Sequence, residues 1–147
     1  MNAARILPEL QASLLCEEVR QEANGNLFLI GVINFIRVPQ LPVVATRVCV
    51  FNRWTSGVGR FAETTRLLAP DGMTVLGKGE TKFELQDPAH HTSRVHVFTS
   101  VELKTSGTYF IEVMVDDVMK IRAPLSVALA PPQNQPAVNP VAEQKQA

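Results

Sequence analysis

The chain contains little cysteine and no excess of charge of either sign. Among its 147 residues are two cysteines, one tryptophan and one tyrosine. Two cysteines are too few for the disulfide framework that holds many small secreted domains together. Its 14 basic residues balance 14 acidic ones, so the formal net charge is zero. This balance argues against a general polyanion binder, because such binding depends on many cationic contacts to phosphate. We therefore expect no nucleic-acid partner.

Long apolar runs are also missing. The longest one, residues 27–33, is far too short to cross a bilayer. The first 19 residues contain no apolar core of seven residues, since Glu9 interrupts them early, and so they do not resemble a secretory signal. From these absences we expect a soluble cytoplasmic protein with no membrane partner.

The chain does have enough apolar sequence for one core. Its hydrophobic share is 46%, and a domain of this length buries roughly 70% of its unfolded surface. We expect three regions: a flexible lead over residues 1–8, a folded domain over 9–129, and a disordered tail over 130–147. The tail is rich in proline and glutamine and has no periodicity, so it cannot bury enough apolar surface to offset the entropy of ordering.

The clearest pattern is the segment 106–129, SGTYFIEVMVDDVMKIRAPLSVAL. Apolar and more polar residues alternate on both sides of Asp116-Asp117, which predicts two strands joined by a tight turn. Tyr109 begins the first of these strands, where immunoglobulin-like folds place a structural tyrosine whose hydroxyl bonds nearby backbone.

Further strands and turns are expected upstream. Leu10–Cys16 is interpreted as a strand, although its composition also suits a helix. The almost wholly apolar stretch 27–36 predicts a central strand covered on both faces, and 52–60 a glycine-containing loop. In 94–103 we expect Val95 and Val97 to share a face with Val101. The remaining predicted features are strands at 43–51, 61–69, 73–76 and 80–85, turns at 24–26 and 70–72, and a break at 77–79.

Short strands at regular spacing with little helix predict an all-β fold. We expect a single immunoglobulin-like antiparallel β-sandwich of about 7–9 strands.

Two stretches resemble a family of short, uncharacterised bacterial proteins, a domain of unknown function. In its opening, a Leu-Leu-Cys strand end is followed by an Asn-Gly turn, a Leu-Ile-Gly strand and a Pro-x-Leu-Pro loop. Here these elements are residues 14–16, 24–25, 29–31 and 39–42. The closing hairpin is similar to that of the family and to immunoglobulin-like hairpins in general. The resemblance implies a fold over about residues 9–129 and no catalytic residue.

No pattern in the sequence points to a catalytic centre or a cofactor. Cys16 and Cys49 lie in apolar runs typical of buried, inert thiols. His90, His91 and His96 are too few and too poorly grouped for a zinc site, which needs three or four converging ligands, and we interpret them as exposed polar residues. The glycine pairs at 57–59 and 77–79 lack the Lys-Ser/Thr and the helix of a phosphate loop.

The candidate contact site is the expected loop at 52–60 with its flanks. Its proposed binding residues are Arg53, Trp54, Arg60 and Phe61, because tryptophan and arginine are enriched at interface hot spots. The competing interpretation is a sign-mixed solvated surface with Trp54 packed into the end of the core. We therefore expect a non-enzymatic protein-interaction or structural module whose partner is another protein or a second copy. The alternative is a small-ligand or carbohydrate-binding sandwich in which Trp54 stacks on a ring.

Overall fold

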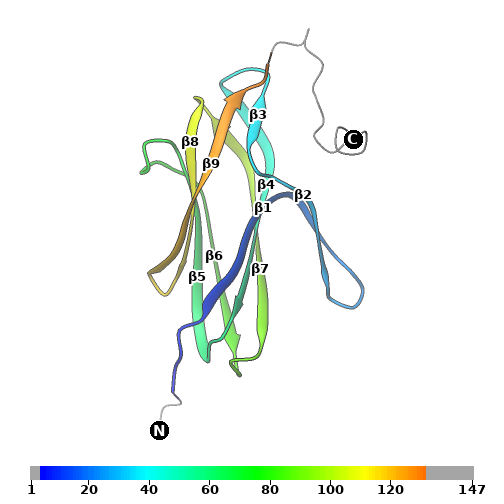
Figure 1. Cartoon of the computed structure of the whole chain (residues 1–147), viewed down its shortest axis with the longest axis vertical. Coiled ribbons are helices and arrows are strands. Elements are labelled where there is room, and N and C mark those ends of the chain that lie inside the picture. The colour runs from blue at the N-terminus through cyan, green and yellow to red at the C-terminus, as the bar shows by residue number, and fades with distance from the viewer. Residues whose placement is uncertain (1–3, 132–147) are drawn as a thin grey trace, which may run out of the picture.

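The computed structural model describes residues 4–131 and contains nine strands within that range, with no helix. The described part of the tail expected over 130–147 is Ala130 and Pro131; the rest lies outside the described residues. The strands, shown in Figure 1, are β1 (Glu9–Gln21), β2 (Leu27–Val32), β3 (Ile36–Val38), β4 (Val43–Thr55), β5 (Gly59–Leu68), β6 (Val75–Leu85), β7 (His91–Leu103), β8 (Gly107–Val115) and β9 (Val118–Leu129).

The strands form two sheets. One has four strands in the order β2-β1-β4-β7, and the other has five in the order β3-β9-β8-β5-β6. All neighbours are antiparallel except β3 and β9, which run parallel. The predicted all-β class and the expected number of strands are therefore confirmed.

A single core lies between the sheets, and both contribute to it. Val50 and Val101 come from the four-stranded sheet, and Val113 and Leu67 from the five-stranded one, each at most 2% exposed. On β5, buried Phe61, Glu63, Thr65 and Leu67 alternate with more exposed neighbours, as expected for a strand with one face turned to a core.

Turns with a local chemical signature occur where the sequence predicts them. Asp116 and Asp117 have positive φ values of 47° and 67° and join β8 to β9, the conformation that tight hairpin turns require. The Asn24-Gly25 turn joins β1 to β2, with φ of 94° at Gly25. Tyr109 is 1% exposed, and its hydroxyl donates to the carbonyl oxygen of Thr105 at 2.8 Å. The expectation of a structural tyrosine is confirmed.

Two expected irregular segments are wholly or mostly strand. The loop predicted over 52–60 is too long, because β4 continues through Thr55 opposite β1 and β7 and β5 begins at Gly59, so residues 56–58 alone connect them. The break predicted at 77–79 is also wrong, since β6 is continuous there and pairs with β5. At Gly77 and Gly79, cross-strand pairing outweighs the weak local preference of glycine for a turn.

The side-chain alternation of β7 reverses within the strand. His96 and Phe98 are buried, whereas Val95 and Val97 are 36% and 49% exposed. Ser100 has a positive φ of 55°, and beyond it Val101 and Leu103 are buried. The prediction that Val95, Val97 and Val101 share one face is therefore wrong. Before Ser100 the even-numbered side chains face the core, and after it the odd-numbered ones do, because Ser100 has an unusual backbone conformation.

Residues 4–8, which belong to the segment expected as a lead, lie against the body. Ile6 exchanges two backbone hydrogen bonds with Val58, at 2.9 and 3.0 Å. Pro8 is buried, and Leu7 packs on the core. At the other end of the described range, the amide of Ala130 donates to the carbonyl of Val38 at 2.7 Å.

Candidate functional site

The four predicted contact residues do not form one surface. Trp54 is completely buried and Phe61 is 3% exposed. Both pack on Phe83, with ring centroids 5.5 and 5.6 Å apart. Trp54 is therefore a core residue, as the competing interpretation of the sequence expected. The two arginines lie on different parts of the surface: Arg53 lines a groove beside β2, and Arg60 lines a separate cleft between β5, β6 and β7.

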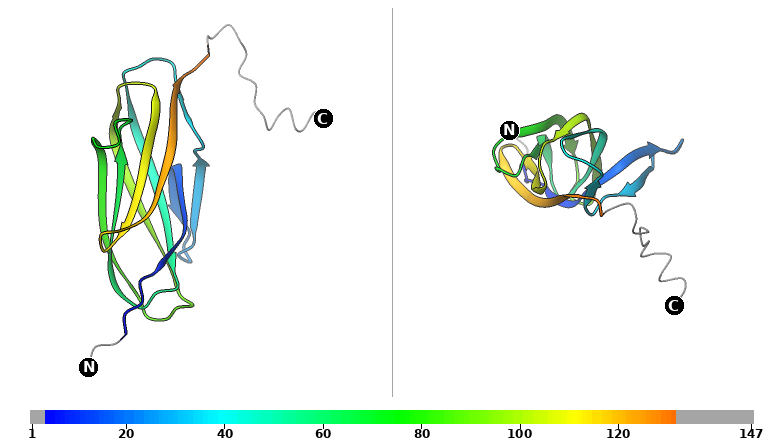
Figure 2. Two further views of the ribbon diagram at one scale, coloured as in Figure 1. Left: turned by 60° about the vertical axis from the view of Figure 1, so that its left-hand side comes forward. Right: turned by 90° about the horizontal axis from the view of Figure 1, so that it is seen from above.

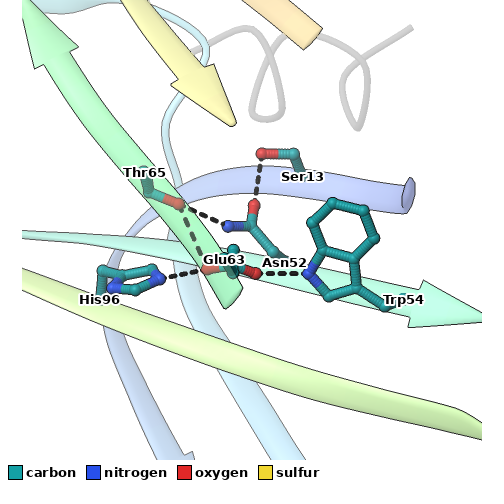
Figure 3. Close-up of polar contacts among 6 residues, drawn as sticks. All are labelled: Ser13, Asn52, Trp54, Glu63, Thr65 and His96. Carbon is teal, nitrogen blue, oxygen red and sulfur yellow. Dashed lines mark hydrogen bonds and ion pairs between the residues drawn. The ribbon is translucent and has the colours of Figure 1, made fainter. Parts of the chain in front are cut away.

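Trp54 belongs to a buried polar network that the sequence analysis missed (Figure 3). Its indole Nε1 donates to the carboxylate of Glu63, which also bonds His96 Nε2 and accepts a hydrogen bond from Thr65 Oγ1 at 3.3 Å. Asn52 extends the network by donating to Thr65 at 2.9 Å. Ser13 Oγ in turn donates to the Asn52 side-chain oxygen at 2.7 Å. The network thus joins β1, β4, β5 and β7 inside the core.

The carboxylate of Glu63 is kept ionised by these donors. Burial by itself would raise the pKa of Glu63, but the hydrogen bonds from His96 and Trp54 and the charge of His96 outweigh it, so the pKa of Glu63 lies below its ordinary value. Glu63 is 0% exposed and His96 is 7% exposed. A carboxylate so enclosed is out of contact with solvent. Its hydrogen bonds join β5 of one sheet to β4 and β7 of the other, so they stabilise one packing of the two sheets.

Two glycines of β6 make room for the inward side chains of β7. A Cβ atom on Gly77 would lie 2.9 Å from a ring carbon of Phe98, and one on Gly79 would collide with Nδ1 of His96. The prediction of His96 as an exposed polar residue is therefore wrong, whereas His90 and His91 are exposed as expected. The glycine pair is a packing feature, because any side chain there would displace the rings that β7 turns inward.

The two cysteines lie directly opposite each other on β1 and β4. Both are free and completely buried, which confirms the interpretation of buried thiols. Burial, and secondarily the proximity of Cys49, raises the pKa of Cys16, so its thiolate form is scarce and its reactivity low.

Within residues 4–131, no group of three or more histidine, cysteine, aspartate or glutamate side chains is placed to hold a metal ion. That same range includes no helix long and apolar enough to span a membrane.

A cleft of about 630 Å³ lies beside Arg60. Its lining combines Phe61 and Phe83 with the cationic side chains of Lys82 and Arg94. Arg94 lies over the Phe83 ring at 5.7 Å, and its buried Nε has no hydrogen-bond partner among the described residues. Glu84 and Asp116 also line the cleft, but they pair with Arg60 at 3.6 Å and with Arg5.

The most unusual surface is the end of the β1–β2 hairpin, residues 17–32, which we call the arm. In Figures 1 and 2 the arm projects from the sandwich. It is bounded by a groove of about 890 Å³. On the arm side the groove is lined by Leu27 and Leu29, and on the sheet side by Phe51, Arg53 and Val95.

The arm exposes apolar side chains on a free strand edge. In the described part of the chain, β2 pairs with β1 alone and forms one border of its sheet. Phe28 is 49% exposed, Ile30 38% and Val32 48%, and Phe35 just beyond the strand is 52% exposed. The prediction that 27–36 is a central strand covered on both faces is therefore wrong. Ile33 and Ile36 pack on the core. The sequence of β2 has the composition of a covered strand, but nothing among the described residues covers its outer side chains.

Comparison with known proteins gives one family. The family model described as "Family of unknown function (DUF6941)" matches residues 11–128. No curated protein matches the chain.

Proposed function

The chain belongs to the DUF6941 family of unknown function, and from its structure we propose that it is a non-enzymatic protein-interaction module. Its contact element is the arm, and strand β2 is the edge to which a strand of another polypeptide adds. The observation that carries this proposal is the uncharged apolar sequence of β2, residues 27–32, on an exposed sheet border. Addition of a strand would satisfy the free backbone groups and cover these side chains.

The other borders support the proposal by contrast. Native proteins protect sheet edges with charged side chains, short strands or covering segments. β6 carries Lys78, Glu80, Lys82 and Glu84. β3 has three residues, one of them Arg37, and is followed by Pro39. β7 has β6 packed against it at Gly77 and Gly79. Among residues 4–131, β2 has no charged side chain and no covering segment, which argues that its edge is available for binding.

Two of the predicted contact residues, Trp54 and Phe61, stabilise the fold instead. Trp54 and Phe61 form core contacts, so they support the sandwich that carries the arm. Of the originally expected contact residues, Arg53 stays in the proposed site, since it lines the groove next to the arm.

We also propose that the fold is a variant of the immunoglobulin-like sandwich. In support, β1, β4 and β7 follow one another in one sheet and β9, β8, β5 and β6 in the other, the order of the A, B, E and G, F, C, C′ strands. The Tyr109 hydroxyl bond near the start of β8 matches the tyrosine corner of that fold. The expected bacterial source and cytoplasmic location stay predictions.

Binding of a small anionic ligand is a second candidate function. It rests on the cleft whose lining includes Lys82 and Arg94. Arg94 lies over the Phe83 ring, and its Nε lacks a partner within the described residues. An aromatic carboxylate such as benzoate should then raise the melting temperature of the wild type but not of Arg94→Met. The same shift in both proteins would remove this candidate. Sugar stacking on Trp54 has no support, because that ring is completely buried.

The main proposal is tested by capture from a native lysate. The bait proteins are the wild type, Ile30→Lys in the arm, and Met73→Lys as a control, since Met73 is 82% exposed in the turn between β5 and β6. A partner retained by the wild type and the control but lost with Ile30→Lys is the expected result. Equal capture by all three baits would refute a role for the arm.

A further inference from the structure

The geometry points to a second copy of this chain as the occupant of the β2 edge. We propose that two chains pair β2 against β2, antiparallel and about a two-fold axis, so that their four-stranded sheets become one continuous sheet. This inference rests on the proposed function and specifies its partner.

Charge is the first argument for a second copy. A strand laid along β2 lies beside Phe28, Ile30 and Val32, which are 38–49% exposed. Residues 27–36 include no charged side chain that could pair with a charge brought by a partner. Glu18 and Arg20 on β1 lie opposite Ile30 and Phe28 but already pair with each other at 3.1 Å. A charged partner strand would therefore lose hydration without gaining an opposite charge on β2. β2 of a second copy is uncharged and apolar by its own sequence, and a two-fold interface places the same patch on both sides.

The shape of the arm is the second argument. Two identical bodies pair edge to edge more easily when the edges extend beyond the rest of the molecule, because the bodies then do not collide. The view from above in Figure 2 shows the arm extending away from the two packed sheets. β2 lies on the border of the sheet in that arm, so two copies can align their β2 edges while their bodies remain apart.

The exposed area indicates how strong the pairing is. Phe28, Ile30, Val32 and Phe35 are each about half exposed, which leaves on the order of 300 Å² of apolar surface per copy. Stable specific interfaces bury about 800 Å² per partner, and smaller ones belong to weak or transient complexes. We therefore expect a reversible dimer with a Kd of about 1–100 µM.

The experiment measures mass against concentration. Sedimentation equilibrium of the full chain from 1 to 500 µM should show wild type moving from 16.2 kDa toward twice that mass. An antiparallel register that puts Phe28, Ile30 and Val32 of both copies on one face, centred on β2, pairs Ile30 with Ile30 of the second copy. Ile30→Lys and, separately, Ile30→Glu should each raise the dimer Kd at least 10-fold, because like charges then face each other across the axis. Met73→Lys, whose substituted side chain lies in a turn outside the arm, should dimerise like the wild type.

Mixing the two variants separates an interface effect from a folding defect. Lys at position 30 of one chain and Glu at position 30 of the other should restore dimers at low salt, and 1 M salt should reverse that rescue. A wild type that stays monomeric at 500 µM would overturn the inference. So would a dimer whose Kd is the same in wild type, Ile30→Lys and Ile30→Glu. If the wild type is monomeric but lysate capture still depends on Ile30, only the identity of the partner is wrong; if neither depends on Ile30, the proposed function fails as well.

Discussion

Replacing Glu63 by Gln tests the role assigned to the buried network. The substitution keeps the shape of the side chain but replaces an acceptor oxygen with an NH₂ group. Trp54 bonds one carboxylate oxygen of Glu63, and Thr65 and His96 share the other. In Gln, an NH₂ group either faces the Trp54 N–H or replaces the acceptor that Thr65 and His96 share, so at least one existing hydrogen bond is lost. An unsatisfied buried donor costs about 1–3 kcal/mol, and loss of the charge opposite His96 adds to this. We expect Glu63→Gln to lower the free energy of unfolding by about 2–4 kcal/mol.

The pH dependence of this difference gives a sharper test. Because the folded pKa of Glu63 lies below its ordinary value of 4.5, the stabilisation by its charge is complete above pH 4.5. It is lost as the pH falls through the folded pKa. The gap between wild type and Glu63→Gln should therefore be constant from pH 6 down to about pH 5 and shrink at lower pH.

Urea unfolding followed by circular dichroism measures both effects. The matched control is Glu80→Gln on the neighbouring strand β6, because the Glu80 side chain is 65% exposed and pairs with Lys78 at 3.1 Å. Its effect should stay within about 0.5 kcal/mol. A Glu63→Gln variant within 1 kcal/mol of wild type at pH 7, or a gap that widens in acid, would refute the reasoning.

Three further outcomes follow from the packing. A thiol reagent should label neither Cys16 nor Cys49 in the native protein and both in denaturant, since both are completely buried; fast native labelling would contradict this. Gly79→Ala should cost about 1–3 kcal/mol because its Cβ meets the His96 ring, and the cost should shrink in a His96→Ala background. Tyr109→Phe should cost about 1 kcal/mol through loss of its hydroxyl bond, measured by urea unfolding; no loss would contradict a structural role.

Turns were predictable from the sequence because their chemistry is local. Asn24-Gly25 and Asp116-Asp117 occur where positive φ values are needed, and these residue types adopt them most readily. The all-β class was predictable for a similar reason, since alternation over a few residues suffices to recognise a strand.

The network was not recognisable, because burial depends on partners distant in sequence. Along β5, Glu63 lies an even number of residues from the buried apolar residues Phe61 and Leu67, so it shares their face. This alternation was the one sequence signal that Glu63 is buried. His96 had no such signal, because the reversal at Ser100 changes which face of β7 is inward. Glu63 and His96 are far apart along the chain, and they meet because the two sheets pack face to face.

The arm was misinterpreted for a different reason. An uncharged run such as 27–36 has the same composition whether its cover comes from the same chain or from another one. The sequence indicated that these residues suit burial, and the structure places residues 27–32 of the run on a free border. The exposure of apolar residues that suit burial is the basis of the proposed interface.

The placement of the two ends of the described chain has a mechanical consequence. In Figure 1, β1 starts near one end of the long axis, and β9 finishes near the other. A force pulling the two ends apart acts along both strands, β1 sliding against β4 and β9 against β8, to which they are paired over most of their lengths. Many backbone hydrogen bonds then bear the load together instead of opening one at a time. The domain should therefore resist extension in an optical trap more strongly than its thermodynamic stability alone would indicate.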